Sequence, residues 1–172
     1  MDPSRISLRP LKLSDIDDFL KWASDDRVTR YLWTMSTIKS RKEALSYIEK
    51  DVMPHPWHRT ICLDDRSIGY ISVKPEPGDD KCRAKISYAV GADYWGQGIV
   101  ARTLKMAISL VFKDFPDLVR LEALVESENG ASQRVLEKVG FLKEGLMRKY
   151  GFSKGEIKDV FLYSFLSTDK IL

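Results

Sequence analysis

The sequence predicts a mixed α+β protein built around one sheet, with the element order β-α-α-β-β-β-α-β-α-β-β. Three strand-like runs in the middle of the chain follow one another with only turn signals between them. Apolar residues at helical spacing then alternate with strand-like runs, and one clear crossover joins Arg83–Val90 to Arg120–Val125. Because the chain has 172 residues and no repeat or linker, we expect residues 1–172 to form a single domain with its own core.

The first part of the chain predicts a strand and two helices. Arg5–Pro10 alternates enough to form a strand. We expect Ser14 to open a helix, with Asp17 in the capping-box position. Its apolar face then consists of Ile16, Phe19, Leu20 and Ala23. A polar connection, SDDRVTRYLWTMST, leads to a second helix that is ended by Pro54 and Pro56 and has Leu45, Ile48 and Val52 on its apolar face.

The middle of the chain predicts an antiparallel meander and then a long helix. The turn signals DDRS and PEPGDD separate three strands, which are Thr60–Leu63, Ser67–Lys74 and Arg83–Val90. The long amphipathic helix that follows is closed by Pro116 and has its apolar face at Val100, Leu104, Ala107, Ile108 and Val111.

The last part of the chain predicts one helix between strands. Arg120–Val125 is expected to be a strand, and Ala131–Val139 is expected to be a helix with Gly140 as its C-cap. Two final strands, around Phe141–Lys149 and Ile157–Leu166, are expected to flank the turn GFSKG.

Composition and charge narrow the class of protein. The chain is 44% hydrophobic and 31% charged, with a formal charge of +3, and its Lys and Arg residues form no stripe of the kind that nucleic-acid binders carry. The N-terminus has no apolar signal core and no run reaches the length of a membrane span, so we expect a cytoplasmic protein. Cys62 and Cys82 fall in strand-like runs and are expected to be reduced core thiols. His55 and His58 lack partner ligands at metal spacing, so they are expected to be loop residues and no metal is expected.

Gly96 and Gly98 stand between a strand-like run and a helical run. At such a place, free backbone N–H groups and the positive end of the helix dipole favour an anion. Glycine also lets the chain pass close to phosphate oxygens without a side chain intervening. The sequence therefore predicts a phosphate-binding turn.

A dinucleotide is one candidate ligand for this turn. The segment GQGIVA, Gly96–Ala101, satisfies the G-x-G-x-x-G/A pattern, and Glu126 ends the next strand, where a ribose-binding acid would lie. However, GADYW separates the strand from the turn and three meander strands come first. Glu126 also lies further along the chain than the roughly 20 residues expected. A dinucleotide-dependent oxidoreductase is therefore the less favoured alternative.

Coenzyme A is the other candidate ligand. The segments YAVGADYWGQGIVARTLKMAI and VESENGASQRVLEKVGFLKEG resemble the GNAT superfamily of acyl-CoA N-acyltransferases. The resemblance is closest to the branch of ribosomal-protein N-terminal acetyltransferases and spermidine acetyltransferases. Its most specific part is Asn129 with Ser132, followed by EKVGF, Glu137–Phe141. The resemblance covers nearly the whole chain, from ISLRPLKLSDIDDFLKW to GEIKDVFLYSFL.

The resemblance implies the GNAT fold, which has a central mixed, mostly antiparallel sheet of about seven strands, with a V-shaped split between the fourth and fifth strands and four flanking helices. It also implies acetyl-CoA as co-substrate, with its pyrophosphate on the backbone amides of the turn. Trp95 stands where the family motif has Gln or Arg, and Val100 departs from its final Gly or Ala. The implied cofactor-binding residues are Tyr88, Ala89, Val90, Gly96, Gln97, Gly98, Ile99, Val100, Ala101, Arg102, Asn129 and Ser132.

The implied reaction needs a neutral amine, a polarised thioester and a proton for the departing thiolate. The resemblance implies that backbone groups of Tyr88–Val90 pair with the pantetheine arm and that the Val90 amide lies near the thioester carbonyl. Glu126 is the expected general base, with Glu128 and Asp159 as weaker candidates.

Ser132 is the expected proton donor for the thiolate. Many relatives use a Tyr one turn later, and here that position is Leu136, which cannot donate. Asn129 is expected to cap the following helix as well as to bind the cofactor.

The acceptor is expected to be a primary amine, either a protein N-terminus or a small molecule such as a polyamine. Tyr31, Trp33 and Trp57 are its candidate contacts. No nucleic-acid or membrane partner is expected, and the chain is expected to act as a monomer or a homodimer. The alternative from another class is a non-catalytic CoA-binding sensor, which Val100 and Leu136 would suit.

Overall fold

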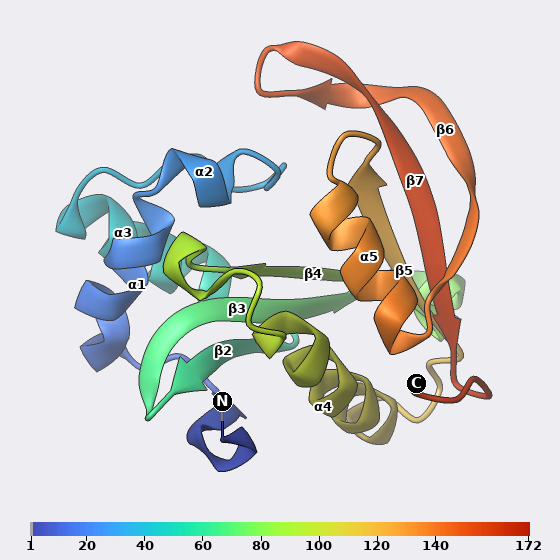
Figure 1. Cartoon of the computed structure of the whole chain (residues 1–172), viewed down its shortest axis with the longest axis horizontal. Coiled ribbons are helices and arrows are strands. Elements are labelled where there is room, and N and C mark those ends of the chain that lie inside the picture. Colours follow the sequence, from blue (N-terminus) through green and yellow to red (C-terminus); the bar gives the residue numbers. More distant parts are fainter. Residues whose placement is uncertain (1) are drawn as a thin grey trace. The chain divides into compact units, whose positions relative to one another are not determined.

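The computed structural model describes residues 2–172 and contains, within them, seven strands and five α-helices (Figure 1). The strands follow the order β1-β2-β3-β4-β5-β7-β6 in the sheet, so the predicted mixed sheet is confirmed. The chain divides into two compact units. Unit 1 consists of residues 2–72 and 88–107, and unit 2 of residues 73–87 and 108–172. The expectation of a single domain stays a prediction.

Unit 1 is built from the N-terminal strands and three helices. The strands are β1 (Ile6–Arg9), β2 (His58–Leu63) and most of β3 (Arg66–Pro75), with β1 and β3 each antiparallel to β2. The helices are α1 (Ile16–Ala23), α2 (Asp26–Thr29) and α3 (Arg41–Tyr47). The end of β4 (Arg83–Val90) and the start of α4 (Ile99–Asp114) complete it.

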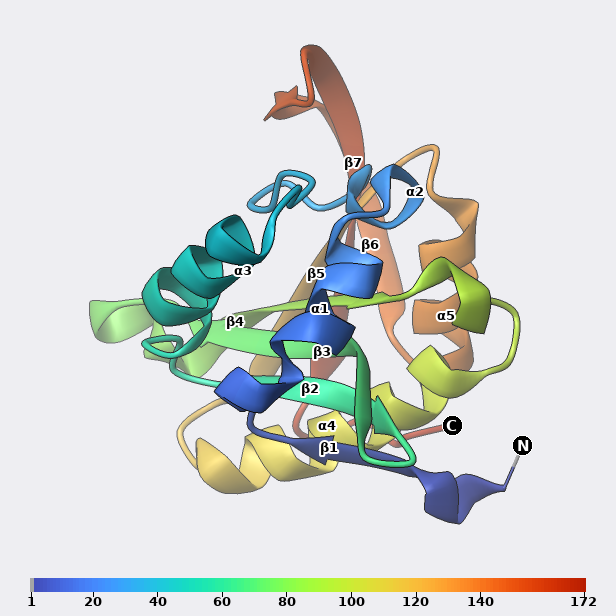
Figure 2. The same ribbon diagram turned by 90° about the vertical axis from the view of Figure 1, so that its left-hand side faces the viewer.

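The core of unit 1 lies between these helices and the sheet. Phe19 and Trp22 of α1 are buried with Ala44 of α3 in one cluster that also contains Tyr70 of β3 and Ala89 of β4. Figure 2 shows α1 and α3 on the same side of β2 and β3. The aromatic rings meet directly, since Phe19 and Trp22 are edge to face with their centroids 4.8 Å apart.

The first helix starts differently from the prediction. Leu13–Asp15 forms a 3-10 turn and α1 begins at Ile16, so Ser14 with Asp17 is not its capping box. Instead, the carboxylate of Asp15 accepts a hydrogen bond from the backbone N–H of Lys12 at 2.8 Å. Asp15 is 7% exposed, whereas Ser14 faces solvent.

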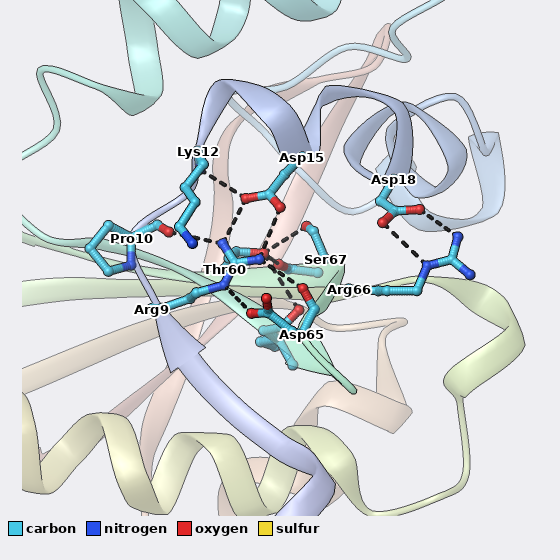
Figure 3. A network of polar contacts seen from close by, with 11 residues as sticks. Arg9, Pro10, Lys12, Asp15, Asp18, Thr60, Asp65, Arg66 and Ser67 are labelled. Atoms are coloured by element: carbon cyan, nitrogen blue, oxygen red, sulfur yellow. Dashed lines mark hydrogen bonds and ion pairs between the residues drawn. The ribbon is translucent and has the colours of Figure 1, made fainter.

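Asp15 is buried because it pairs with Arg9 of β1 (Figure 3). Two guanidinium nitrogens of Arg9 donate to the two oxygens of Asp15 at 2.7 and 2.9 Å, and Arg9 Nε donates to Asp65 at 2.7 Å. Burial alone would raise the pKa of Asp15, but the hydrogen bonds from Arg9 and Lys12 outweigh it and lower the pKa. The network therefore joins β1, the start of α1 and the turn between β2 and β3.

Three other expectations for unit 1 are corrected. Leu45 of α3 is 37% exposed, because the buried face runs through Ala44, Ile48 and Val52 at four-residue spacing. The polar connection contains α2, a single helical turn whose N-cap Asp25 accepts from Arg27 N–H. His58 is a residue of β2 rather than of a loop.

Unit 2 is built from the C-terminal strands and two helices. The start of β4 pairs in parallel with β5 (Arg120–Glu126) through three residues, Arg83–Lys85, and the pairing ends there. This confirms the predicted split between the fourth and fifth strands. α5 (Gly130–Val139) follows, then β6 (Leu142–Ser153) and β7 (Glu156–Leu166), which form the long twisted hairpin of Figure 1.

The core of unit 2 is formed by Leu121, Leu136, Tyr163 and Phe165, which are almost fully buried. The hairpin turn is shorter than the predicted GFSKG, because β6 continues to Ser153 and only Lys154 and Gly155 form the loop. Both have positive φ, as the commonest two-residue hairpin turn requires.

Two observations complete the fold. Cys82 is exposed in a 3-10 turn (Gly78–Cys82), so the expectation of a core strand position was wrong for it, whereas Cys62 is buried; neither is in a disulfide. Within residues 2–172, no helix has the length and apolar character needed to cross a membrane.

We predict that Asp15→Asn destabilises the fold by about 3 kcal/mol, since it leaves the guanidinium of Arg9 without its buried counter-charge. Asp17→Asn is the matched control, because Asp17 pairs with Arg41 at the surface, where both side chains are exposed, and such pairs contribute less than about 1 kcal/mol. Urea unfolding of the three proteins at neutral pH measures both differences. Equal effects of the two substitutions would show that the Arg9–Asp15 pair is not the stabilising one.

The same pair predicts a pH dependence. Folding lowers the pKa of Asp15 below its ordinary 3.8, so its contribution is complete above that pH and is lost as pH falls through the folded-state pKa. The stability difference between the native chain and Asp15→Asn should therefore shrink in acid. Urea midpoints measured at neutral pH and then at successively lower pH test this, and a constant difference would contradict it.

Candidate functional site

The end of β4 is held against β3 at unusually short range. The N–H of Gly91 donates to the carbonyl of Ile68 at 2.8 Å. A Cβ on Gly69 would lie 2.2 Å from the carbonyl oxygen of Ala89 and 2.8 Å from the Cα of Val90. Only glycine allows the two backbones to come this close. We had not identified Gly69 from the sequence, although a glycine inside the apolar run SIGYISV was the available signal.

Trp95 joins the segment after β4 back to the end of that strand. Its indole Nε1 donates to the carbonyl of Val90 at 2.9 Å, while half of the residue stays exposed. Gln97 donates through Nε2 to the carbonyl of Asp93 at 3.0 Å. The loop between β4 and α4 is thus fixed by two of its own side chains. Trp95, which replaces the Gln or Arg of the family motif, therefore fixes the loop to the end of β4.

Gly96 and Gly98 both have positive φ, at 73° and 75°. A Cβ at either position would meet nothing within 4 Å, so it is the backbone conformation that requires glycine. Arg102 N–H makes the first hydrogen bond of α4, to the carbonyl of Gly98. The N–H groups that precede it in the first turn have no acceptor within the helix.

The turn therefore presents backbone donors at the positive end of a helix of 16 residues. Ile99 and Ala101 are buried and Val100 is half-buried, whereas Gln97 and Arg102 are exposed. Of the strand residues expected to bind the cofactor, Ala89 and Val90 are buried and Tyr88 is half-buried. Unit 1 thus brings the predicted cofactor residues of β4 and of the turn together through the hydrogen bond from Trp95 to Val90.

Unit 2 contains the other predicted site residues. Glu126 is the last residue of β5 and is 5% exposed. The side chain of Asn129 accepts from the N–H of Ser132 at 3.1 Å, which confirms that Asn129 caps α5. Ser132 lies in the first turn of α5 and is half-buried. Leu136, one turn later, is fully buried.

Glu126 lines a pocket of about 330 Å³ within unit 2. The pocket lies between the end of β5 and the part of the β6–β7 hairpin nearest its turn. It is lined by Glu126, Ser127, Glu128, Lys149, Glu156, Ile157, Lys158 and Asp159. Glu128 is exposed and Asp159 accepts the N–H of Lys149 at 2.6 Å. The sequence indicated the two glutamates after β5 and Asp159. It did not indicate Lys149, Glu156 or Lys158, because the hairpin register brings these residues to the end of β5.

The aromatic residues expected to contact the acceptor lie in unit 1 in different environments. Trp33 is 38% exposed and Tyr31 is half-buried, with the guanidinium of Arg30 over its ring at 5.1 Å. Trp57 is 2% exposed and is covered by the guanidinium of Arg59 at 4.8 Å.

His58 is a packing residue of unit 1. Its ring is stacked on Tyr70 at 5.3 Å, and burial lowers its pKa to about 3, which keeps it neutral. Across residues 2–172, no group of three or more His, Cys, Asp or Glu is arranged to hold a metal ion.

The chain is similar in sequence to known acetyltransferases. Residues 5–142 match the family model described as an acetyltransferase (GNAT) domain. The chain belongs to this family. It is 29% identical to an uncharacterized N-acetyltransferase, p20, of Bacillus licheniformis over 96% of the chain and 94% of that protein. It is therefore a GNAT N-acetyltransferase.

Solved structures agree on the fold. A GNAT-family acetyltransferase from Bacillus anthracis has a TM-score of 0.83 at 21% identity, with 96% of each chain covered. The ribosomal L7/L12 alpha-N-protein acetyltransferase RimL, solved with coenzyme A, has a TM-score of 0.79 at 20% identity over 95% of this chain and 94% of that one. The spermidine N(1)-acetyltransferase of Escherichia coli is 23% identical over 96% of this chain and 90% of its own length. The GNAT superfamily indicated by the sequence is confirmed by the family model, and these solved structures share its fold.

We predict that Gly69→Ala in this GNAT protein is strongly destabilising, because the added methyl group would collide with the backbone of β4 rather than with a movable side chain. Gly145→Ala is the matched control, since a Cβ there meets nothing within 4 Å. Thermal unfolding should show a fall of at least about 4 °C for Gly69→Ala. A melting temperature equal to that of the control would mean that β3 and β4 separate easily at this point.

Proposed function

We propose that the protein transfers an acetyl group directly from acetyl-CoA to a primary amine within a ternary complex. The acceptor is a protein N-terminus or a small amine such as a polyamine. The observation that carries the proposal is the glycine turn, whose two positive-φ residues lead into the free N–H groups of α4. A CoA pyrophosphate is an anion suited to these donors.

The residues of the glycine turn and of β4 offer the donors and acceptors that the parts of coenzyme A require. The backbone amides of the turn, from Gly96 to Arg102, would hold the pyrophosphate, and Val100 donates as well as glycine would since the donor is its backbone N–H. The backbone of Tyr88–Val90 would pair with the pantetheine arm as a strand does. Asn129 and Ser132 are assigned cofactor contacts in unit 2.

Three groups are assigned catalytic roles. The Val90 N–H polarises the thioester carbonyl, and the backbone around it is fixed by Trp95 and by the approach of Gly69. Glu126 accepts the proton of the substrate ammonium, directly or through water. Ser132 supplies a proton to the departing CoA thiolate, because Leu136 cannot.

The properties of the two cysteines support direct transfer rather than an acyl-enzyme. A nucleophilic cysteine needs a lowered pKa and access to substrate. Burial raises the pKa of the Cys62 thiol, and Cys82 lies in the 3-10 turn before β4. The buried Cys62 thiol is therefore unsuited to forming a thioester intermediate, and the whole of β4 separates Cys82 from the segment that leads to the glycine turn.

Two of the related proteins suggest the kind of acceptor. RimL is a ribosomal L7/L12 alpha-N-protein acetyltransferase, and the Escherichia coli relative is a spermidine N(1)-acetyltransferase. Both acceptors are primary amines that are protonated at neutral pH. Tyr31 and Trp33, which are accessible, are proposed to contact the acceptor. Trp57 is 2% exposed beneath Arg59, so the expectation that it contacts the acceptor is corrected to a packing role.

Isothermal titration of the full chain with acetyl-CoA, NADH and NADPH is the first test. We expect acetyl-CoA to bind and neither NADH nor NADPH to bind. Dinucleotide binding without acetyl-CoA binding would overturn the proposal. Acetyl-CoA binding without turnover over a panel of peptides and small amines would identify a CoA-binding sensor.

Gly98→Ala should weaken acetyl-CoA binding roughly tenfold or more, because alanine is strained at positive φ and reshapes the turn. Gly78→Ala is the matched control, since Gly78 also has positive φ with open space around it but lies in the 3-10 turn before β4. The dissociation constants of both variants are measured by titration. Equal losses would show that general strain, and not the turn, is responsible.

Glu126→Gln should lower kcat on the best amine by roughly 100-fold, since an amide cannot accept the proton. Acetyl-CoA should still bind, because Glu126 is assigned no contact with it. Glu49→Gln serves as control, because Glu49 is exposed in unit 1. A variant with full kcat would remove Glu126 from the reaction.

A further inference from the structure

The pocket of unit 2 owes its shape to a bulge in β6. Met147 pairs with Val160 and Gly151 pairs with Lys158, so residues 148–150 of β6 face Asp159 alone on β7. Lys149 has a φ of 49° in this bulge, and its N–H donates to the carboxylate of Asp159. The carbonyl of Asp159 in turn accepts the N–H of Ser127 at 3.0 Å. The bulge therefore opens a pocket beside the end of β5, and backbone hydrogen bonds hold it in place.

The strand register explains which charges enter the pocket. Glu126 lies opposite Val160, and Lys158 is two residues from Val160 on the same face of β7. Long side chains reach each other across such a diagonal. Glu156 lies two residues before Lys158, and its carboxylate accepts a hydrogen bond from the ammonium of Lys158.

The ammonium of Lys158 lies among the carboxylates that line the pocket. Its side chain is 15% exposed, compared with 69% for Glu156. The hydrogen bond to Glu156 raises the pKa of Lys158, and the charges of Glu128 and Glu126 act in the same direction. Four carboxylates and two ammonium groups line the pocket, so two negative charges remain in excess.

The excess charge and the walls restrict the possible occupant. The carboxylates are not arranged as a metal site in the described part of the chain. The pocket volume of about 330 Å³ is at the lower end of small-molecule sites, and Ile157 adds an apolar wall. An aliphatic diamine matches these properties, because it carries two positive charges on a narrow hydrocarbon chain.

We propose that this pocket binds an aliphatic diamine and that Lys158 determines its affinity by occupying the same carboxylates. The tethered ammonium of Lys158 is hydrogen-bonded to Glu156 and competes with the ligand for this carboxylate. The identification of the diamine with the acetyl acceptor rests on the proposed function, whereas its binding does not. Lys158 is then a specificity-determining residue that keeps affinity for diamines low.

The test is titration of the full chain with 1,4-diaminobutane, without acetyl-CoA and at low ionic strength. Lys158→Met should bind the diamine roughly tenfold more tightly than the native chain, because a competing charge is removed from a partly buried site. Glu128→Gln in the Lys158→Met background should reverse most of this gain. Neutral 1,4-butanediol should bind to none of these proteins.

Lys138→Met is the matched control. Lys138 is exposed in the last turn of α5 and is not part of the pocket lining, so the substitution changes the net charge equally. It should leave diamine binding unchanged. Thermal unfolding of each variant establishes that it is folded, and Lys158→Gln repeats the test if Lys158→Met is not.

The outcomes distinguish a failure of the diamine-binding inference from a failure of the proposed function. Unchanged or weaker diamine binding in the folded Lys158 variants overturns the inference, and so does an equal gain in Lys138→Met. Tighter binding in Lys158→Met supports it. If the diamine binds in this way but is never acetylated, the binding site stands and its role as an acceptor site fails. If amines are acetylated while Lys158 has no effect on binding, the inference alone fails.

Discussion

The close approach of β3 to the end of β4 is the constraint on which the position of the glycine turn depends. Gly69 brings the two backbones together, and the hydrogen bond from Gly91 to Ile68 continues the contact past the last residue of the strand. The chain therefore leaves β4 in one defined direction. Trp95 then ties the loop to Val90. The N-terminus of α4 thus follows a segment held by backbone contacts and by the Trp95 side chain.

Arg9 and Lys158 are both partly buried cations paired with carboxylates, but the first pair stabilises the fold and the second lies at a pocket. Arg9 donates to both oxygens of Asp15 and also to Asp65, so all three guanidinium nitrogens are hydrogen-bonded to carboxylates of the fold. Lys158 is a point charge whose carboxylate partners line a pocket and outnumber it. The first arrangement leaves little unbalanced charge and stabilises the fold. The second retains negative charge at a cavity, which is a requirement for binding a cation.

Local sequence signals predicted the elements well, and long-range contacts account for what they missed. The bounds of β4 and the capping of α5 by Asn129 follow from residues close in sequence. Asp15 replaced Ser14 at the first helix because its partner, Arg9, comes from β1. The glycine turn was evident from its own residues, whereas the roles of Gly69 and Trp95 depend on where Val90 lies in the sheet.

The pocket of unit 2 could not be predicted from the sequence, for a related physical reason. A β-bulge changes which residues face each other, and nothing in the letters MRKYG shows that residues 148–150 will oppose Asp159 alone. Without that register, Lys158 reads as an ordinary exposed lysine of a hairpin. With it, the lysine becomes a positive charge among carboxylates near the proposed base, Glu126. The ammonium of Lys158 already occupies a carboxylate of this pocket. In the proposal above, a diamine must compete with that ammonium, and the strength of the competition sets which amines the pocket can hold.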